Sequence, residues 1–308
     1  MPSITILETP HIYELTAPVA NPKRPVLVFV HGWLLSRHYW QPLVALLQSE
    51  YQCLIYDARG FGDSQRNRVL KKPISSRSTD LNTTVANAES GSRDYSLSSY
   101  ARDLGCLLTE LSIENAWLVG HSLGGSVALW AADLYPESVR GAICLNAGGG
   151  IYLKEEFERF RNAGQQLVKF RPRWLSYVPF IDFAFSRMMV ARPLSRKWGR
   201  QRVLDFIKAD RAAAMGALLE STTEAEVHLL PQLVSRLQQP VYFVAGDRDR
   251  VMDVKYVNHL ASFHYLFASG DSNVFQLENC GHLGMIEALC EVAEIIDRVL
   301  DKHSPDIE

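Results

Sequence analysis

The stretch Ala116–Gly125, AWLVGHSLGG, combines a strand, a sharp turn and the start of a helix. AWLVG is a short aliphatic run without polar alternation, which is typical of a strand buried on both faces of a parallel sheet. The residues after it, up to about Leu134, follow the pattern of a helix. Ser122 stands between the two, with glycines on either side. The stretch therefore predicts a strand–turn–helix unit that presents Ser122 at the carboxyl end of a strand.

Apolar runs of the same kind recur along the chain. Five of them are interpreted as further strands: Val26–Val30, Cys53–Tyr56, Ala142–Leu145, Val241–Ala245 and Val274–Glu278. Helical patterns lie between them, including one that Ser96 begins as N-cap and a C-terminal one with an apolar stripe from Ile286 to Val299. Strands that alternate with helices in this way predict an α/β fold, with a mostly parallel sheet flanked by helices.

Two segments interrupt this alternation. Residues 65–95 are rich in Ser, Arg, Asn and Thr without periodicity, and we expect a flexible surface loop within the core. Residues 151–237 are helical in pattern, carry many aromatic residues and lie between two predicted strands. We interpret them as an inserted helical cap, or lid, on a core formed by residues 1–150 and 238–308.

The composition excludes several classes of protein. Of 308 residues, 47% are hydrophobic and 21% charged, which is ordinary for a globular protein and unlike a disordered or fibrous one. The net charge of −2 and the lack of nucleic-acid motifs give no indication of a nucleic-acid partner. No metal-binding or nucleotide-binding motif is found, so neither a metal nor another cofactor is expected.

The cysteines and the N-terminus bear on localisation. The five cysteines are widely spaced and form no C-x-x-C pair, which argues against a disulfide framework and favours a reducing compartment, the cytoplasm. The N-terminus does not resemble a signal peptide, and no run of 18 uncharged apolar residues occurs.

The turn serine needs partners if it is to act as a nucleophile. An imidazole must take the hydroxyl proton, and a carboxylate must fix the tautomer of that imidazole. His282 follows the run Val274–Glu278, and two carboxylates, Asp247 and Asp249, follow the run Val241–Ala245. Both aspartates and the histidine follow late strands. The three residue types therefore occur along the chain in the order Ser, Asp, His. The residues alone leave open which aspartate serves.

An acyl-transfer site also needs two backbone N–H groups aimed at the oxyanion. One comes from the residue after the nucleophile, which is Leu123. The other comes from a loop after an earlier strand, and Trp33 stands in such a place, in His31-Gly32-Trp33 directly after Val26–Val30. Trp33 and Leu123 are therefore the candidates for an oxyanion hole.

These motifs occur in the order found in the α/β-hydrolase superfamily, and Asp57–Ser64 resembles its D-x-R-G-x-G-x-S turn. From about Pro25 to Asp301 the chain resembles a cap-bearing serine hydrolase of that superfamily, similar to esterases and lipases and also to C–C bond hydrolases. The family pattern places an apolar residue two positions after the acid, which selects Asp249 with Val251.

The resemblance assigns roles to individual residues. It implies a catalytic triad of Ser122, Asp249 and His282, without a cofactor. Glu287, five residues after His282, resembles the glutamate of the family's G-H-x-x-x-x-E. His121 is expected to pack behind the nucleophile in a structural role.

The expected cap is basic and apolar at once. From Lys154 to Arg211 there are 14 Lys and Arg against 6 Asp and Glu. Residues 174–190 are mostly apolar, and a helix beginning at Pro179 would leave only a narrow polar stripe. Four aromatic residues of this segment are candidate substrate contacts: Trp174, Tyr177, Phe180 and Phe183.

Two interpretations of the cap exterior stay open. In one, an apolar side roofs the active-site cleft and the basic residues are simply solvated. In the other, the apolar and basic surface makes peripheral contact with an anionic membrane.

The resemblance implies hydrolysis of a carboxylic ester through an acyl-enzyme. The apolar roof favours a hydrophobic small-molecule substrate with a long acyl, prenyl or aromatic portion. One alternative is a C–C bond hydrolase of keto acids, or a pyruvate-eliminating synthase of the menaquinone and phylloquinone pathways, in which cap arginines would bind carboxylates. A more remote alternative is a non-catalytic binding module built on the hydrolase fold.

Overall fold

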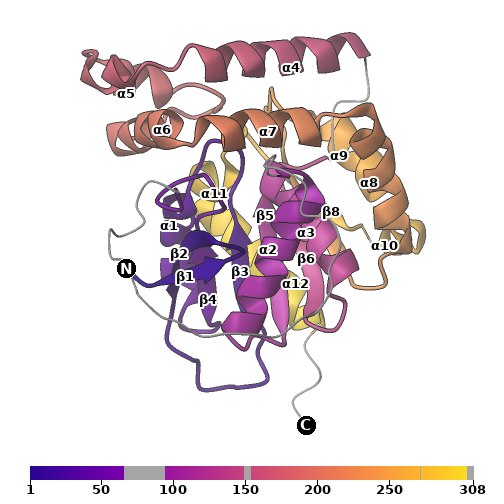
Figure 1. Cartoon of the computed structure of the whole chain (residues 1–308). Helices are drawn as coiled ribbons and strands as arrows, with labels where there is room; N and C mark the ends of the chain where they lie inside the picture. The colour runs from indigo at the N-terminus through magenta and orange to yellow at the C-terminus, as the bar shows by residue number, and fades with distance from the viewer. Residues whose placement is uncertain (66–93, 149–153, 271, 304–308) are drawn as a thin grey trace, which may run out of the picture.

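The computed structural model describes residues 1–65, 94–148, 154–270 and 272–303 (Figure 1). Most of the segment expected to be a flexible loop, residues 66–93, lies outside the described residues. In the described part of the chain, eight strands form one sheet in the order β1-β2-β4-β3-β5-β6-β7-β8. Their bounds are β1 Ser3–Ile6, β2 Thr9–Leu15, β3 Val26–Val30, β4 Cys53–Tyr56, β5 Ala116–His121, β6 Val139–Leu145, β7 Val241–Gly246 and β8 Val274–Leu277.

The α/β fold with a mostly parallel sheet is confirmed. Strands β3 to β8 pair in parallel, and the hairpin β1–β2 adds an antiparallel edge through β4. The sequence analysis assigned no strand to residues 3–15. Most of their side chains are polar or only partly buried, so this edge hairpin lacks the continuous apolar run that marks the inner strands.

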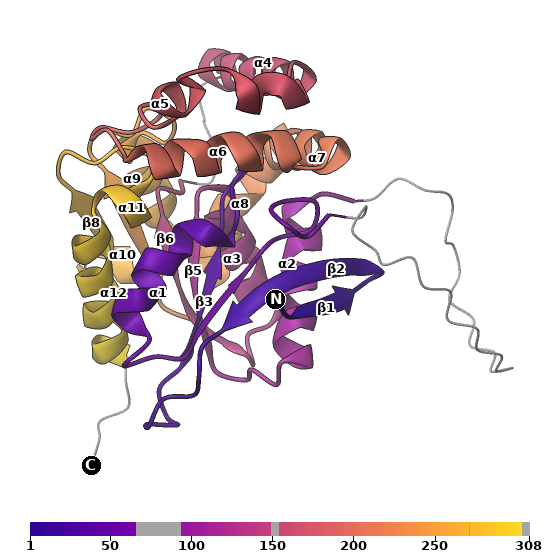
Figure 2. The same ribbon diagram turned by 90° about the vertical axis from the view of Figure 1, so that its left-hand side faces the viewer.

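Helices cover both faces of the sheet (Figures 1 and 2). Alternate strand residues point to opposite faces, so Val28 belongs to one buried cluster and Leu27 and Phe29 to the other. The predicted N-cap is present, because the Ser96 hydroxyl accepts a hydrogen bond from the Ser99 N–H at 3.2 Å. The helices of the core are α1 Gln41–Leu47, α2 Leu97–Glu110, α3 Leu123–Leu134, α8 Glu224–Arg236, α9 Val254–Ala261, α10 Tyr265–Ala268, α11 Gly284–Glu287 and α12 Leu289–His303.

A helical insertion follows β6, and we call its residues 154–221 the cap. It contains α4 Lys154–Lys169, the 3-10 helix η3 Arg173–Tyr177, α5 Ile181–Phe185, α6 Arg196–Lys208 and α7 Arg211–Ser221. Both views show two layers: α6 and α7 lie next to the core, and α4 and α5 lie outside them (Figures 1 and 2). No helix in the described part of the chain is long and apolar enough to cross a membrane.

The predicted cap boundary at residue 237 comes after helix α8, which packs on the core. Helix α8 packs against α3, and its residues Leu230, Leu233 and Val234 are fully buried in the main core cluster. It is therefore the crossover helix that returns the chain to β7, as a parallel connection requires. Composition did not separate it from the cap, because both are helical.

The short helix that contains Asp182 begins two residues after Pro179. Phe180 has a left-handed backbone with φ 62°, and α5 begins only at Ile181 and ends at Phe185. Asp182 does not form an exposed polar stripe. It is buried and pairs with Arg196 and Arg200 of α6, at 2.9 and 3.1 Å.

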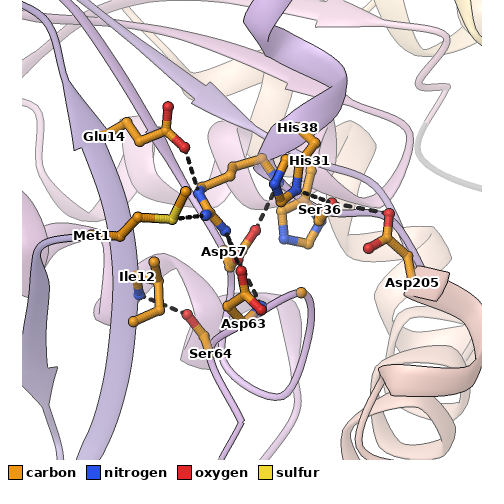
Figure 3. Close-up of polar contacts among 12 residues, drawn as sticks. Met1, Ile12, Glu14, His31, Ser36, His38, Asp57, Asp63, Ser64 and Asp205 are labelled. Carbon is orange, nitrogen blue, oxygen red and sulfur yellow. Dashed lines mark hydrogen bonds and ion pairs between the residues drawn. The ribbon is translucent and has the colours of Figure 1, made fainter. Parts of the chain in front are cut away.

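A buried ion-pair network fixes the loop after β3 to the turn after β4 (Figure 3). The Arg37 guanidinium is fully buried and pairs with Asp57, with Glu14 of β2 at 2.9 Å and with Asp63 at 3.2 Å. Asp57 also accepts hydrogen bonds from the backbone N–H groups of Arg37 and Asp63, at 2.7 and 2.8 Å. Because the charges pair inside the protein, removal of one partner would leave another unpaired and buried.

The cap is attached to the core by hydrogen bonds at α6 and α7. Ser36 of the loop after β3 donates to the carboxylate of Asp205 on α6 at 2.9 Å (Figure 3), and the Trp33 indole donates to the Ala214 carbonyl on α7 at 2.8 Å. Asp205 is buried, and burial raises the pKa of its carboxyl group to about 7.

This raised pKa makes the stability of the protein depend on pH. The usual pKa of an aspartate is about 4, so between about pH 4 and pH 7 the folded state holds a proton that the unfolded state releases. Stability therefore falls as pH rises through that window. We expect Asp205→Asn to raise the melting temperature at about pH 8 by a few degrees, and to change it less at about pH 5.

Thermal unfolding at the two pH values measures this effect, with the exposed Asp301→Asn as a matched control. The same change in melting temperature for Asp205→Asn at both pH values would contradict the assignment.

Candidate active site

Ser122 lies in a strained turn between β5 and α3. Its backbone has φ 52° and ψ −120°, a region that non-glycine residues avoid. Glycine is required on either side of Ser122, because backbone atoms of neighbouring segments come too close for a Cβ atom. A Cβ atom on Gly120 would lie 2.3 Å from the Gly124 carbonyl oxygen, and one on Gly124 would lie 2.2 Å from the Val30 carbonyl oxygen. The turn thus holds Ser122 at the carboxyl end of β5 with helix α3 directly behind it.

His282 reaches the serine from the loop after β8. Its Nε2 lies 3.2 Å from the Ser122 Oγ, and its ring is almost fully buried. The His282 backbone N–H donates to the Met189 carbonyl at 2.9 Å, so the cap contacts this loop directly. The imidazole is therefore placed to accept the proton of the hydroxyl.

Asp249, and not Asp247, contacts the histidine. The Asp249 Oδ2 lies 2.7 Å from the His282 Nδ1, whereas Asp247 is exposed and accepts a hydrogen bond from the Cys280 N–H. Burial by itself would raise the pKa of the Asp249 carboxyl. The His282 charge and hydrogen bond, with the N–H groups of Met252 and Val251, outweigh burial and hold this pKa below its usual value. Asp249 is thus kept ionised beside the imidazole.

Asn146 completes the site and was missed by the sequence analysis. It follows β6 directly, with a left-handed φ of 50°. Its Nδ2 donates to the Asp249 Oδ2 at 3.0 Å and to the Gly281 carbonyl at 3.1 Å. No local sequence pattern marks this amide, because its partners lie on loops far along the chain. Asn146 joins the acid loop and the histidine loop across the end of the sheet.

Glu287 anchors the histidine loop to the cap. Its carboxylate accepts hydrogen bonds from the N–H groups of Gly281 and Leu283, both at 3.1 Å, and of Ala191 at 2.7 Å. Glu287, which the family pattern indicated, therefore fixes the residues on both sides of His282. It also connects the chain after α5 to the same loop.

His121 precedes Ser122, and its ring packs against that of His282, with the ring centroids 4.9 Å apart. Its Nε2 donates to the His282 carbonyl at 2.7 Å. Burial lowers the pKa of the imidazole to about 3, so the ring is neutral near pH 7.

Trp33 and Leu123 are the two candidates for the oxyanion hole. Both residues line the cavity that contains Ser122. Among the turn, loop and cap hydrogen bonds of the described residues, none comes from the N–H of Trp33 or Leu123. The loop of Trp33 is held by the buried His31 ring, whose Nδ1 donates to the Gly32 carbonyl at 2.8 Å and whose Nε2 accepts from the Ala58 N–H.

A largely apolar cavity lies between the core and the cap, with Ser122 and His282 in its wall. Among the described residues of that wall, Arg202 of α6 is the one Lys, Arg, Asp or Glu. Among the described residues, no cluster of three or more His, Cys, Asp and Glu side chains could hold a metal ion. The apolar wall includes Leu34, Leu35, Phe157, Phe160, Leu167, Phe185, Met188, Met189, Phe206, Leu218, Val227, Val251, Met252 and Leu283.

The four aromatic residues expected to contact substrate do not line this cavity. Trp174, Tyr177, Phe180 and Phe183 are all exposed on the cap exterior. Other phenylalanines of the cap occupy the wall instead. An apolar residue of an inserted segment can face either the cavity or the solvent, and the short helices of this region follow no period that distinguishes the two.

Known proteins match this chain over most of its length. A family model described as alpha/beta hydrolase fold matches residues 25–289. The uncharacterized hydrolase YugF of Bacillus subtilis is 23% identical, with 85% of each chain covered. The bifunctional esterase/perhydrolase DCH of Acinetobacter calcoaceticus is 25% identical over 74% of this chain and 75% of its own.

Solved structures share the fold at lower identity. A thermophilic esterase from Thermogutta terrifontis superposes with a TM-score of 0.70 at 19% identity, with 99% of each chain covered. A putative lipase from Acinetobacter baumannii gives a TM-score of 0.73 at 19% identity, covering 98% of this chain and 90% of its own. Since the family model covers most of the sequence and the sheet has the architecture it describes, the chain belongs to the α/β-hydrolase fold family.

Proposed function

We propose that this protein is a serine esterase that cleaves carboxylic esters of hydrophobic substrates through an acyl-enzyme. The observation that carries the proposal is the line of contacts from Ser122 through His282 to Asp249, at 3.2 and 2.7 Å, in the wall of an apolar cavity. The similarity to an esterase and a putative lipase supports the same class of reaction. The five free cysteines favour a reducing compartment such as the cytoplasm as its location.

The proposed reaction has two steps. Ser122 Oγ attacks the ester carbonyl carbon while His282 Nε2 takes the hydroxyl proton, and Asp249 stabilises the charged imidazolium. The N–H groups of Trp33 and Leu123 bind the oxyanion. The tetrahedral intermediate then expels the alcohol, which receives the proton from His282. Water, activated by His282, hydrolyses the acyl-enzyme and restores the Ser122 hydroxyl.

The cavity wall favours an apolar group on the substrate. Phenylalanine, leucine and methionine side chains from both the core and the cap make up most of the wall. Each CH₂ group that leaves water for such a site contributes about 0.8 kcal/mol to binding. We therefore assign an ester with a long acyl or aromatic portion.

Arg202 favours a second candidate, a substrate that carries a carboxylate, as in hydrolysis of the C–C bond of a keto acid. The guanidinium is buried in the cavity wall, and burial lowers its pKa. In the described part of the chain it donates to the carbonyls of Phe185 and Met188 and forms no ion pair with an acid. A buried, unpaired cation attracts an anionic group. Turnover of keto acids in preference to neutral esters would select this candidate.

Chemical labelling tests whether Ser122 is the nucleophile. A fluorophosphonate probe reacts with an activated serine, and we expect it to label the wild type and not Ser122→Ala. The labelling, measured by intact mass, should persist in Ser126→Ala, because Ser126 lies in the same wall away from the line of contacts through His282. The reverse pattern would assign the nucleophile to Ser126 and contradict the proposal.

Kinetics of two variants test which aspartate acts with His282. Asp249→Asn removes the charge that stabilises the imidazolium, and we expect kcat for a soluble p-nitrophenyl ester to fall by about 10⁴-fold. Asp247→Asn is the matched control, and its kcat should stay within about threefold of the wild type, because this carboxylate contacts the Cys280 N–H and not the imidazole. A larger loss in Asp247→Asn than in Asp249→Asn would overturn the assignment.

A further inference from the structure

Exposed apolar side chains gather on the outside of the cap. Phe170, Trp174, Tyr177 and Phe180 are exposed by 64–86%, and Phe183 by 46%. We call these five residues the outer cap face. They lie on and between the end of α4 and α5, in the layer that Figures 1 and 2 both place farthest from the sheet. A group of this size on one segment marks a surface for interaction.

The backbone at Phe180 is strained while its ring stays in water. Its φ of 62° is a genuine outlier for a bulky residue, and such conformations cost about 1–3 kcal/mol. The ring is 74% exposed, so it gains little from packing within the chain. Folding alone does not explain why this conformation holds an aromatic ring outward.

Basic residues are concentrated in the same segment as the outer cap face. Residues 169–200 contain eight Lys and Arg and a single acidic residue, Asp182, which is buried and paired with Arg196 and Arg200. The whole chain has a net charge of −2, so the remainder of the molecule is net acidic. A segment that combines exposed apolar and basic side chains is complementary to a bilayer interface that contains anionic lipids.

The same segment forms part of the cavity wall. Leu167, Met188 and Met189 line the cavity of Ser122 and are also exposed by 38–40%. These residues come directly before and after the outer cap face in the chain. These three residues therefore place a solvent-exposed part of the cavity wall next to the outer cap face in the chain.

A second copy of this chain fits the outer cap face less well than an anionic lipid surface does. In a symmetric dimer the same patch meets itself, and here two strongly basic surfaces would face each other. Like charges across an interface oppose association. Anionic headgroups would instead neutralise the basic residues.

We propose that the outer cap face docks on an anionic lipid surface, with the aromatic rings in the interface and the basic residues against the headgroups. The cavity opening then lies at the membrane, so an apolar ester can enter from the bilayer. This entry route rests on the proposed esterase function, whereas docking itself does not.

Co-sedimentation with vesicles tests the docking. We expect the wild type to bind vesicles of phosphatidylcholine mixed with phosphatidylglycerol at low salt, and to bind pure phosphatidylcholine at least tenfold more weakly. High salt should release it, because exposed charges are screened within about 8 Å or less. The triple variant Lys169→Gln, Arg173→Gln, Lys197→Gln should lose at least tenfold in partitioning. The matched control on the core is Arg102→Gln, Arg140→Gln, Arg298→Gln, which should bind as the wild type does.

A second pair of variants tests the aromatic residues. Phe170→Ser, Trp174→Ser, Tyr177→Ser should also lose at least tenfold in binding to the mixed vesicles. The control Leu46→Ser, Tyr265→Ser, Phe267→Ser removes apolar residues that are exposed by 42–47% on the core, and it should not lose binding. All four triple variants alter exposed side chains, so their melting temperatures should stay close to that of the wild type.

Three results would overturn the docking. The first is that the wild type does not bind the mixed vesicles at low salt. The second is that the cap variants and the control variants lose the same amount of vesicle binding. The third is that the protein forms a dimer without lipid and that the aromatic cap substitutions dissociate this dimer. Hydrolysis of a short soluble ester is measured in parallel and should be the same in all variants. Failure of the wild type to hydrolyse any ester would contradict the proposed function and leave the vesicle result standing.

Discussion

The left-handed backbone at Ser122 is the constraint around which the site is built. It costs about 1–3 kcal/mol and is retained because β5 and α3 are both fixed by the core on either side of it. Gly120 and Gly124 let the strand, the helix and the loop after β3 approach within distances that no side chain would allow. The result is a hydroxyl held clear of its own helix, at the edge where the loops of the parallel strands meet.

The other loops are positioned by hydrogen bonds to one another rather than by their own sequence. Asn146 connects the aspartate loop to the histidine loop, and Glu287 connects the histidine loop to the chain after α5. On the opposite side, His31 and the buried network of Arg37 and Asp57 hold the loop that carries Trp33. Polar groups buried in this way must all be paired, so each of them restricts the others. The cap participates in this arrangement through Met189, Ala191 and Ala214, so it is attached at points well inside its length.

Sequence could predict the parts of this structure that have a local cause. The inner strands have continuous apolar runs because both faces are buried, and the serine turn needs glycines because of its close contacts. The edge hairpin β1–β2 is partly exposed and gave no such signal. The choice of Asp249 over Asp247 depended on a resemblance, since both follow the same strand and only the fold of the loop decides which one meets His282. The exposed positions of Trp174 and Tyr177 could not be predicted, because composition does not say which side of a short helix faces the cavity.

The central claim is that Ser122 carries the acyl group of the substrate during turnover. Rapid acid quenching with a p-nitrophenyl carbamate, whose acyl group leaves the enzyme slowly, followed by mass spectrometry of peptides, tests it most directly. We expect one carbamoyl group on the peptide that contains Ser122, released in step with the recovery of activity. Loss of activity with this peptide unmodified, or with the group on another residue, would contradict it.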